Sequence, residues 1–325
     1  MDSAVKLGEI SSVPYSVLTP PGYHQSGPLP LCLFLMGGGG SRQSLIDCQP
    51  LFESWWSDGW LAPMILATPS AGMSYYLDWE SFIADHFLTQ LRQELHASSD
   101  RESTAIAGIS MGGYGALKIA FARPDLFGAV AALQPLLEPG FRDADVGPRN
   151  RLHHSAGGPA QLLGPDRDAA LVEANNPANR ARANAAEIRD RDLAIYLEVG
   201  DDDFINAHDG AEFLHRVLWN LDISHEYRLI RCGDHGGPTL VPRMRDAFRW
   251  VGSVLTESRS AESTELDPAV SIWIESGMIG APPPVAAGSK EFLRVMRAQL
   301  QPLRERAAEM DANTKRRYGA LPVVS

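Results

Sequence analysis

The amino-acid sequence predicts an α/β fold in which a mostly parallel central sheet carries helices on both faces. Apolar runs without alternation, such as residues 29–36, are typical of strands that are buried on both sides. Amphipathic helical segments such as residues 79–95 stand between these runs, and strands that alternate with helices favour parallel pairing. We expect strands at 29–36, 62–68, 105–109, 129–136, 193–199 and 227–231, and helices at 45–60, 79–95, 212–219 and 243–255.

The strand that begins at Ala105 runs into Gly108-Ile109-Ser110-Met111-Gly112, which fits the G-x-S-x-G pattern of a nucleophile elbow. The chain folds back on itself in such a turn, so the positions two before and two after the serine need glycine. The N–H groups of the following helix point toward the space above Ser110, where an anionic intermediate would be stabilised. The alternative is a glycine-rich helix start whose serine only caps the helix. The strand before Ser110 and the helix after it favour the nucleophile.

Two further loops follow predicted strands and therefore lie at the same edge of the sheet as Ser110. Gly37 to Gly40 come directly after the strand at 29–36, and they form either a flexible turn or an oxyanion loop whose backbone approaches a ligand closely. Residues 69–79 form a loop rich in aromatic side chains. We expect Gly39, Tyr75, Tyr76 and Trp79 to contribute to substrate binding, although Trp79 fits buried packing equally well.

A nucleophilic serine needs a base, and the base needs a group that orients it. His235 lies in a glycine-rich loop after a late strand, and the acidic run of Asp201, Asp202 and Asp203 follows the strand before it. Serine, aspartate and histidine thus come in the chain order of α/β-hydrolases. The alternatives are a surface histidine and an acidic turn or cation site. The neighbouring sequence lacks the oxygen ligands of a calcium or magnesium site, so we expect no metal.

Composition and charge restrict the class of protein. The net charge of −11 argues against nucleic acid and against an anionic membrane surface as partners. The first residues lack the apolar run of a signal peptide, and no stretch has the length of a transmembrane helix. The three cysteines have no C-x-x-C spacing, which disfavours disulfides and a thiolate metal site. We therefore expect a cytoplasmic enzyme.

The sequence changes character at two places. Residues 139–190 combine prolines, glycines and charges, including the pair His153-His154, and suggest an insertion near the active site in a domain that spans residues 1–255. Residues 256–289 form a predicted linker that is rich in Ser and Glu and contains three consecutive prolines. Residues 290–325 are predicted to be a helical extension. Its apolar stripe must pack either against the hydrolase domain of the same chain or against a second copy, and of the two a homo-oligomer through this helix is favoured.

The chain resembles the esterase D family of α/β-hydrolases. The matching segments are Pro21-Gly22-Tyr23, residues 37–41, residues 107–116, residues 121–127 and residues 200–204, and the resemblance covers about residues 5–255. The family groups S-formylglutathione hydrolases, feruloyl and acetyl-xylan esterases, siderophore esterases and mycolyltransferases.

This resemblance implies an α/β-hydrolase fold and assigns roles to particular residues. Ser110 would be the nucleophile, His235 the base and Asp203 the acid, because the family aspartate directly precedes a pair such as Phe204-Ile205. The oxyanion donors would be the backbone N–H groups of Gly38 and Met111. Two departures stand out. Met36 replaces the usual histidine before the loop glycines, and Gly236-Gly237-Pro238 replaces the aromatic that commonly follows the catalytic histidine.

The function predicted from these features is a serine carboxylic-ester hydrolase that cleaves a small-molecule ester or thioester through an acyl-enzyme and needs no cofactor. An acyltransferase that uses the same triad is an alternative. A non-catalytic binding protein on a hydrolase scaffold is an alternative of another class. An intact set of Ser110, Asp203 and His235 argues against the binding protein, which would have no use for all three.

Overall fold

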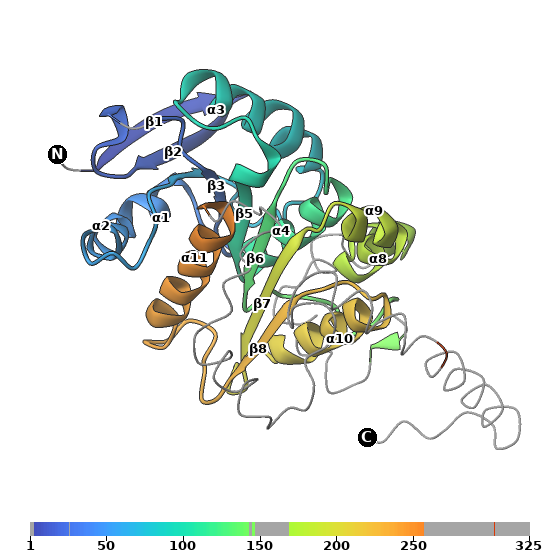
Figure 1. Ribbon diagram of the computed structural model, residues 1–325. Coiled ribbons are helices and arrows are strands. Elements are labelled where there is room, and N and C mark those ends of the chain that lie inside the picture. The colour runs from blue at the N-terminus through green and yellow to red at the C-terminus, as the bar shows by residue number, and fades with distance from the viewer. Residues whose placement is uncertain (1–2, 26, 143–144, 147–168, 257–301, 303–325) are drawn as a thin grey trace, which may run out of the picture. The chain divides into compact units, whose positions relative to one another are not determined.

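The computed structural model describes residues 3–25, 27–142, 145–146, 169–256 and 302 (Figure 1). The contacts divide the chain into two units, residues 1–257 and 258–325, and all that follows concerns the first. Apart from Thr256 and Pro302, the predicted linker and C-terminal extension lie outside the described residues. His153, His154 and the middle of the predicted insertion lie outside them as well. The domain boundaries and the homo-oligomer stay predictions.

An eight-stranded sheet with the order β1-β2-β4-β3-β5-β6-β7-β8 forms the centre of the first unit. The strands are β1 (Ala4–Ile10), β2 (Val13–Thr19), β3 (Leu31–Leu35), β4 (Ile65–Pro69), β5 (Thr104–Ile109), β6 (Ala129–Leu133), β7 (Ala194–Gly200) and β8 (Glu226–Ile230). β1 and β2 form an antiparallel hairpin that pairs with β4, and the strands from β4 to β8 are all parallel. The predicted fold class, a mostly parallel sheet of the α/β-hydrolase type, is confirmed.

Helices cover both faces of this sheet (Figure 1). One face carries α1 (Arg42–Asp47), α2 (Gln49–Ser57) and α11 (Leu240–Thr256), and the other carries α3 (Leu88–Glu94), α4 (Met111–Ala122), α8 (Pro177–Ala183) and α10 (Ala207–Asn220). Short helices α7 (Ala169–Asn175) and α9 (Ala185–Asp190) flank α8 in the chain. Within the described residues, no helix has the length and apolarity that crossing a membrane requires.

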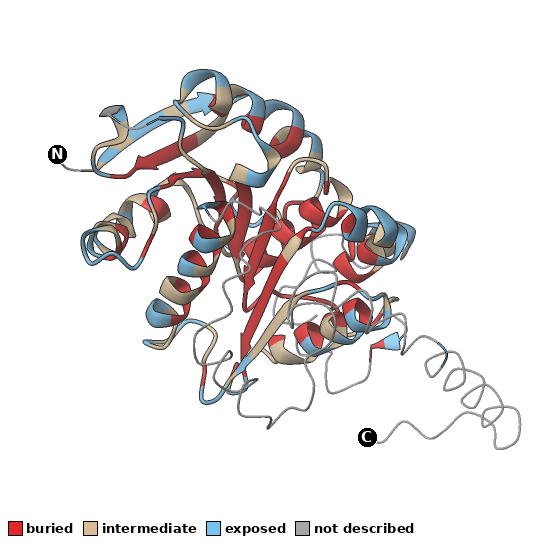
Figure 2. Cartoon of the chain, in the orientation of Figure 1, coloured by how far each residue is buried: buried red, intermediate tan, exposed pale blue. Residues whose placement is uncertain are grey.

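Strand residues divide by alternation between two apolar layers. In β3, Leu31, Leu33 and Leu35 join the layer beneath α3 and α4. Phe34 lies in the other layer, where its ring packs edge-on against Phe248 of α11 at 4.8 Å. Figure 2 shows the central strands almost wholly buried. Burial on both faces is why these strands show no apolar-polar alternation in the sequence.

Two predicted helices are less regular than expected. The segment 45–60 forms α1 and α2, which divide at Cys48. Pro50 stands in the first turn of α2 and has no N–H with which to continue the helix from α1. The segment 79–95 contains a π-helical stretch, Phe82–Phe87, before α3. The helix predicted at 212–219 begins five residues earlier, because α10 spans Ala207–Asn220, and the other predicted strands and helices lie within three residues of their expected limits.

Candidate active site

Ser110 occupies the sharp turn between β5 and α4. Its backbone has φ 56° and ψ −119°, a conformation that non-glycine residues seldom adopt. A Cβ atom on Gly108 would lie 2.1 Å from the carbonyl oxygen of Gly112, and a Cβ on Gly112 would lie 2.0 Å from that of Leu35. Both obstacles are backbone atoms, so neither position tolerates a side chain without a shift of the chain. The G-x-S-x-G pattern is thus explained by contact distances.

Ser110, His235 and Asp203 come together at the carboxyl ends of the parallel strands. Ser110 Oγ lies 2.9 Å from Nε2 of His235, and Nδ1 of the same ring lies 2.6 Å from Oδ2 of Asp203. Asp203 follows β7, and His235 lies in the loop after β8. An ionised carboxylate only accepts hydrogen bonds, so Nδ1 of His235 carries the proton and Nε2 is left to accept from Ser110.

Asp203 differs from the two acids before it by its burial. Its side chain is fully buried, whereas Asp201 and Asp202 are exposed. Burial alone would raise the pKa of Asp203. The hydrogen bond and charge of His235 and the N–H groups of Ile205 and Ala207 more than offset this effect, so the pKa lies below its ordinary value. Asp203 is therefore the acid of this run that faces His235.

The glycine loop after β3 passes directly beside Ser110. A Cβ on Gly37 would lie 3.5 Å from the Cβ of Ser110, and Gly38 is the next residue along the loop. Among the described residues, no hydrogen-bond acceptor is found for the N–H of Gly38. Met111 is the first residue of α4, so its N–H lies at the positive end of that helix. Gly38 and Met111 thus bracket Ser110 from two elements.

The residues predicted for substrate binding occupy different environments. Tyr75 and Tyr76 are only 2% and 0% exposed, and the Tyr76 hydroxyl donates to the carbonyl of Met36 just before the glycine loop. The N–H of Gly39 donates to Gly72 O at 3.0 Å, and Trp79 is half-buried against the core. Tyr76 therefore lies behind the glycine loop and supports it from within.

Sequence analysis missed Lys118, which also supports this region. It lies on α4 and is 1% exposed. Its ammonium group donates to the backbone carbonyl oxygen of Tyr76 at 2.6 Å and to Oδ1 of Asn175 at 2.9 Å. Burial lowers the pKa of Lys118 to about 8. A signal was present in the sequence, because Lys118 is the one charge in the otherwise apolar stretch 111–122.

Sequence analysis also missed two exposed apolar side chains beside the triad. Phe204 is 76% exposed, and its ring meets that of His235 edge-on at 5.8 Å. Met73 is 52% exposed, and its sulfur would lie 2.9 Å from a Cβ on Gly38. Large apolar side chains in water are costly and often mark contact surfaces. Phe204 lies beside His235 and Met73 lies beside the glycine loop.

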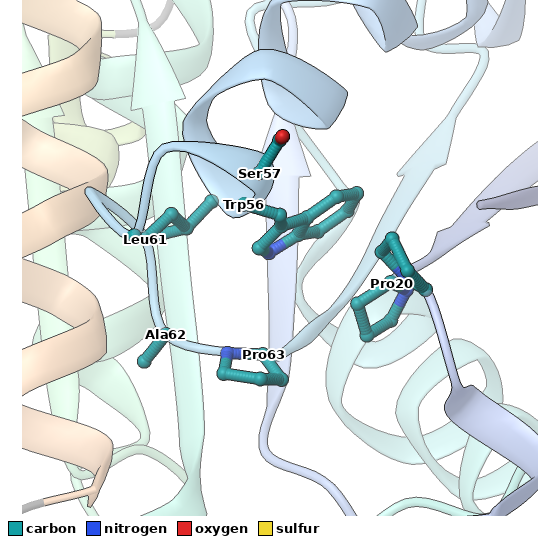
Figure 3. Close-up of a pocket in the computed structure, with 8 residues that line it drawn as sticks. Pro20, Trp56, Ser57, Leu61, Ala62 and Pro63 are labelled. Atoms are coloured by element: carbon teal, nitrogen blue, oxygen red, sulfur yellow. The ribbon is translucent and has the colours of Figure 1, made fainter. Parts of the chain in front are cut away.

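A pocket of about 610 Å³ lies at the end of the sheet where the parallel strands begin. Pro20, Trp56 and Pro63 contribute to its lining (Figure 3). Pro20 follows β2 and Pro63 precedes β4, and these two strands are antiparallel. Both prolines therefore lie at the amino ends of the parallel strands, whereas Ser110 lies at a carboxyl end. This pocket is separate from the site around Ser110.

Comparison with protein families places this site in context. The model of the family described as "Putative esterase" matches residues 11–235, a span that ends at His235. No curated protein matches the sequence.

Several solved structures share the fold. A ferulic acid esterase is 20% identical, with 78% of this chain and 99% of that chain covered and a TM-score of 0.61. The fluorophosphonate-binding serine hydrolase F of Staphylococcus aureus is 17% identical, with coverage of 78% and 98% and a TM-score of 0.59. An S-formylglutathione hydrolase from Agrobacterium tumefaciens is 17% identical, with coverage of 78% and 95% and a TM-score of 0.58.

Proposed function

Because this chain belongs to the esterase family, whose model spans residues 11–235, we propose that it cleaves a carboxylic ester or thioester through an acyl-enzyme on Ser110. Membership makes the chain a serine hydrolase that acts on ester bonds. The observation that carries the finer proposal is the unbroken hydrogen-bonded chain from Ser110 through His235 to Asp203. A strained serine, a histidine and a buried carboxylate that meet in this order form the arrangement that activates a serine for attack on an acyl group.

In the first half-reaction, Nε2 of His235 accepts the proton of Ser110 while Oγ attacks the carbonyl carbon of the substrate. Asp203 stabilises the imidazolium that forms and keeps its Nδ1–H turned toward the carboxylate. The tetrahedral intermediate collapses, and the leaving alcohol or thiol takes the proton from Nε2. In the second half-reaction, Nε2 of His235 takes a proton from water while the water oxygen attacks the acyl carbonyl carbon. The second tetrahedral intermediate then collapses, the acid leaves, and Nε2 returns the proton to Oγ of Ser110.

The negative charge of each tetrahedral intermediate needs donors that are in place before the reaction. We assign this role to the backbone N–H groups of Gly38 and Met111. Gly38 fits because the glycine loop passes against Ser110, and Met111 fits because it begins α4, whose dipole favours an anion there. Since both donors belong to the backbone, the proposal does not depend on which side chain occupies position 36.

The substrate contacts that we propose are Met73 and Phe204. Both are exposed and flank the triad, whereas the burial of Tyr75 and Tyr76 removes them from the proposed set. The engaged N–H of Gly39 likewise leaves it without a donor to offer a substrate. Two apolar side chains at the site favour substrates with an apolar group beside the scissile bond.

The test combines labelling with turnover of nitrophenyl esters and thioesters of graded acyl length. Ser110→Ala is expected to lower kcat by about a million-fold, as removal of the serine does in other triad enzymes, and to abolish labelling by a fluorophosphonate. Ser98→Ala, at the amino end of the sheet, serves as the matched control and keeps both. Labelling of Ser110→Ala, or unchanged turnover, would contradict the proposal. Faster product formation with an added alcohol would identify an acyltransferase.

A further inference from the structure

A second group of buried polar residues lies behind His235 and takes no part in the reaction steps above. Gln134 follows β6, Glu198 lies within β7 and Arg243 lies in the first turns of α11. They are 1%, 0% and 5% exposed, although the strands and helix around them are largely apolar. Burying an amide, a carboxylate and a guanidinium is costly unless each finds its partners.

Arg243 forms an ion pair with Glu198 and also binds the loop that carries His235. Its Nε and Nη2 donate to Oε1 of Glu198 at 2.9 and 2.5 Å, which fixes the plane of the guanidinium. Its remaining nitrogen, Nη1, donates to the carbonyl of Asp234 at 2.6 Å. That carbonyl belongs to the peptide bond that precedes His235.

Gln134 holds the other side of the same residue. Its Nε2 donates to the carbonyl of His235, and its Oε1 accepts from Nη2 of Arg243 at 2.9 Å. Its backbone is also constrained, with φ of 40° and an N–H that donates to the carbonyl of Glu198 at 2.6 Å. The carbonyl groups of the peptide bonds before and after His235 are therefore both held by buried side chains.

The same segment touches the nucleophile. The N–H of Ser110 donates to the carbonyl of Leu133 at 2.9 Å, and the N–H of Leu136 donates to the carbonyl of Ser110 at 3.4 Å. Gln134 lies between Leu133 and Leu136 in the chain. One short stretch of backbone after β6 therefore binds the elbow, while its glutamine side chain binds the loop of His235.

We propose that Gln134 and Arg243, with Glu198 behind them, are positioning residues that set the orientation of the His235 imidazole relative to Ser110. This inference rests on the proposed function of the triad. The direction of the Cα–Cβ bond of His235 follows from the planes of its two peptide bonds. Arg243 and Gln134 fix these planes by binding the carbonyl groups of Asp234 and His235. Misplacing a reacting group by about 1 Å costs on the order of a hundred-fold in rate.

The central variant is Gln134→Met, which keeps the volume of the side chain and removes both hydrogen bonds. It is expected to fold, to lower kcat by about ten- to a hundred-fold and to leave KM within about two-fold, because no substrate contact changes. Arg243→Lys keeps the charge but loses the planar fork, and the same split with a smaller loss of kcat is expected. If Gln134→Met does not fold, Arg243→Lys carries the test.

Arg101→Lys is the matched control, because Nε of Arg101 also donates to a loop carbonyl, that of Pro124, at 2.7 Å. It precedes β5 at the amino end of the sheet, so its loss is expected to leave kcat unchanged. An equal loss of kcat in this control would show a general effect on stability and overturn the positioning role.

A double-mutant cycle separates positioning from mere support of the fold. In a His235→Ala background the residual rate no longer depends on the imidazole, so adding Gln134→Met is expected to change it by less than about two-fold. A full ten-fold or larger loss in that background, or an unchanged kcat for folded Gln134→Met alone, would overturn the inference. Unchanged activity of His235→Ala alone would instead overturn the proposed function.

Discussion

Oγ of Ser110 and Nε2 of His235 lie 2.9 Å apart, yet the segments that carry the two residues are held in different ways. The turn at Ser110 is held by backbone contacts, since glycines let Gly108, Gly112 and Leu35 come together without side chains between them. The loop of His235 is held by the side chains of Gln134, which follows β6, and Arg243 of α11, and Glu198 of β7 in turn binds Arg243. A methyl group should therefore harm the first segment, and the loss of a polar side chain should harm the second.

The two segments also differ in how freely they can drift. The elbow is continuous with β5 and α4, two elements whose positions are set by the core. The loop after β8 follows an edge strand that is only half-buried. A residue in such a loop needs tertiary hydrogen bonds to hold one position, and His235 has them through both adjoining carbonyls and through Asp203.

Among the variants that contrast the two segments, Asp203→Asn on the side of the base is expected to have the largest effect. An amide at this position favours the wrong tautomer of His235. The same substitution in a Ser-His-Asp triad on another fold lowers kcat by about ten-thousand-fold, and we expect a loss of that order here. Asp201→Asn and Asp202→Asn are the controls, because both side chains are exposed and neighbouring side chains diverge. Steady-state turnover of a nitrophenyl ester measures all three. A crippled Asp202→Asn with a normal Asp203→Asn would show that the acid has been misassigned by one residue.

A smaller but still large effect is expected at the elbow, from Gly112→Ala. The added methyl would meet the carbonyl oxygen of Leu35 at 2.0 Å, so the backbone must move. We expect kcat to fall by about a hundred-fold and the free energy of unfolding to fall by about 1–3 kcal/mol. Gly236→Ala in the loop of the base is the matched control, because nothing lies within 4 Å of its Cβ. Turnover and urea unfolding of both variants measure the two effects. A larger loss of kcat or of stability in Gly236→Ala than in Gly112→Ala would contradict the prediction.

The smallest effect on activity is expected for Lys118, the one buried charge on α4, where the change is in stability. The pKa of Lys118 falls from 10.5 to about 8 on folding, so between these values the unfolded chain binds more protons than the folded chain. Stability should therefore rise with pH across this window, and below pH 8 the full cost of burying the charge is present. The difference corresponds to about 3 kcal/mol at most.

Lys118→Met removes this titration. Urea unfolding at pH 7.5 and 9.5 should show the wild type gaining stability relative to Lys118→Met over that interval. Parallel changes in the two proteins would mean that Lys118 titrates normally. Such a result would show that the hydrogen bonds from Lys118 to Tyr76 and Asn175 fully offset the cost of burying its charge.

Much of the site was predictable because it is written in contiguous stretches of sequence. The strand, glycines and serine of residues 104–112 form one motif, and the expected elbow is found there. The chain order of Ser110, Asp203 and His235 placed three distant residues at one sheet edge, because parallel strands bring their carboxyl ends together. The aromatic loop was harder. Its composition suggested a pocket wall, whereas Tyr75 and Tyr76, which both have positive φ angles, are buried in the core.

From the sequence alone one can predict the fold class, the elbow motif and a set of candidate site residues, because apolar periodicity and glycine spacing act over a few residues at a time. The tertiary structure decided which partners those residues have. Glu198 is a lone carboxylate in an apolar strand, so a cation must meet it, but nothing in the pattern selects Arg243 among 29 lysines and arginines. That choice depends on the register of β7 against its neighbours and on the rotation of α11. Both are set by packing between segments far apart in the chain, where local sequence carries no record of the contact.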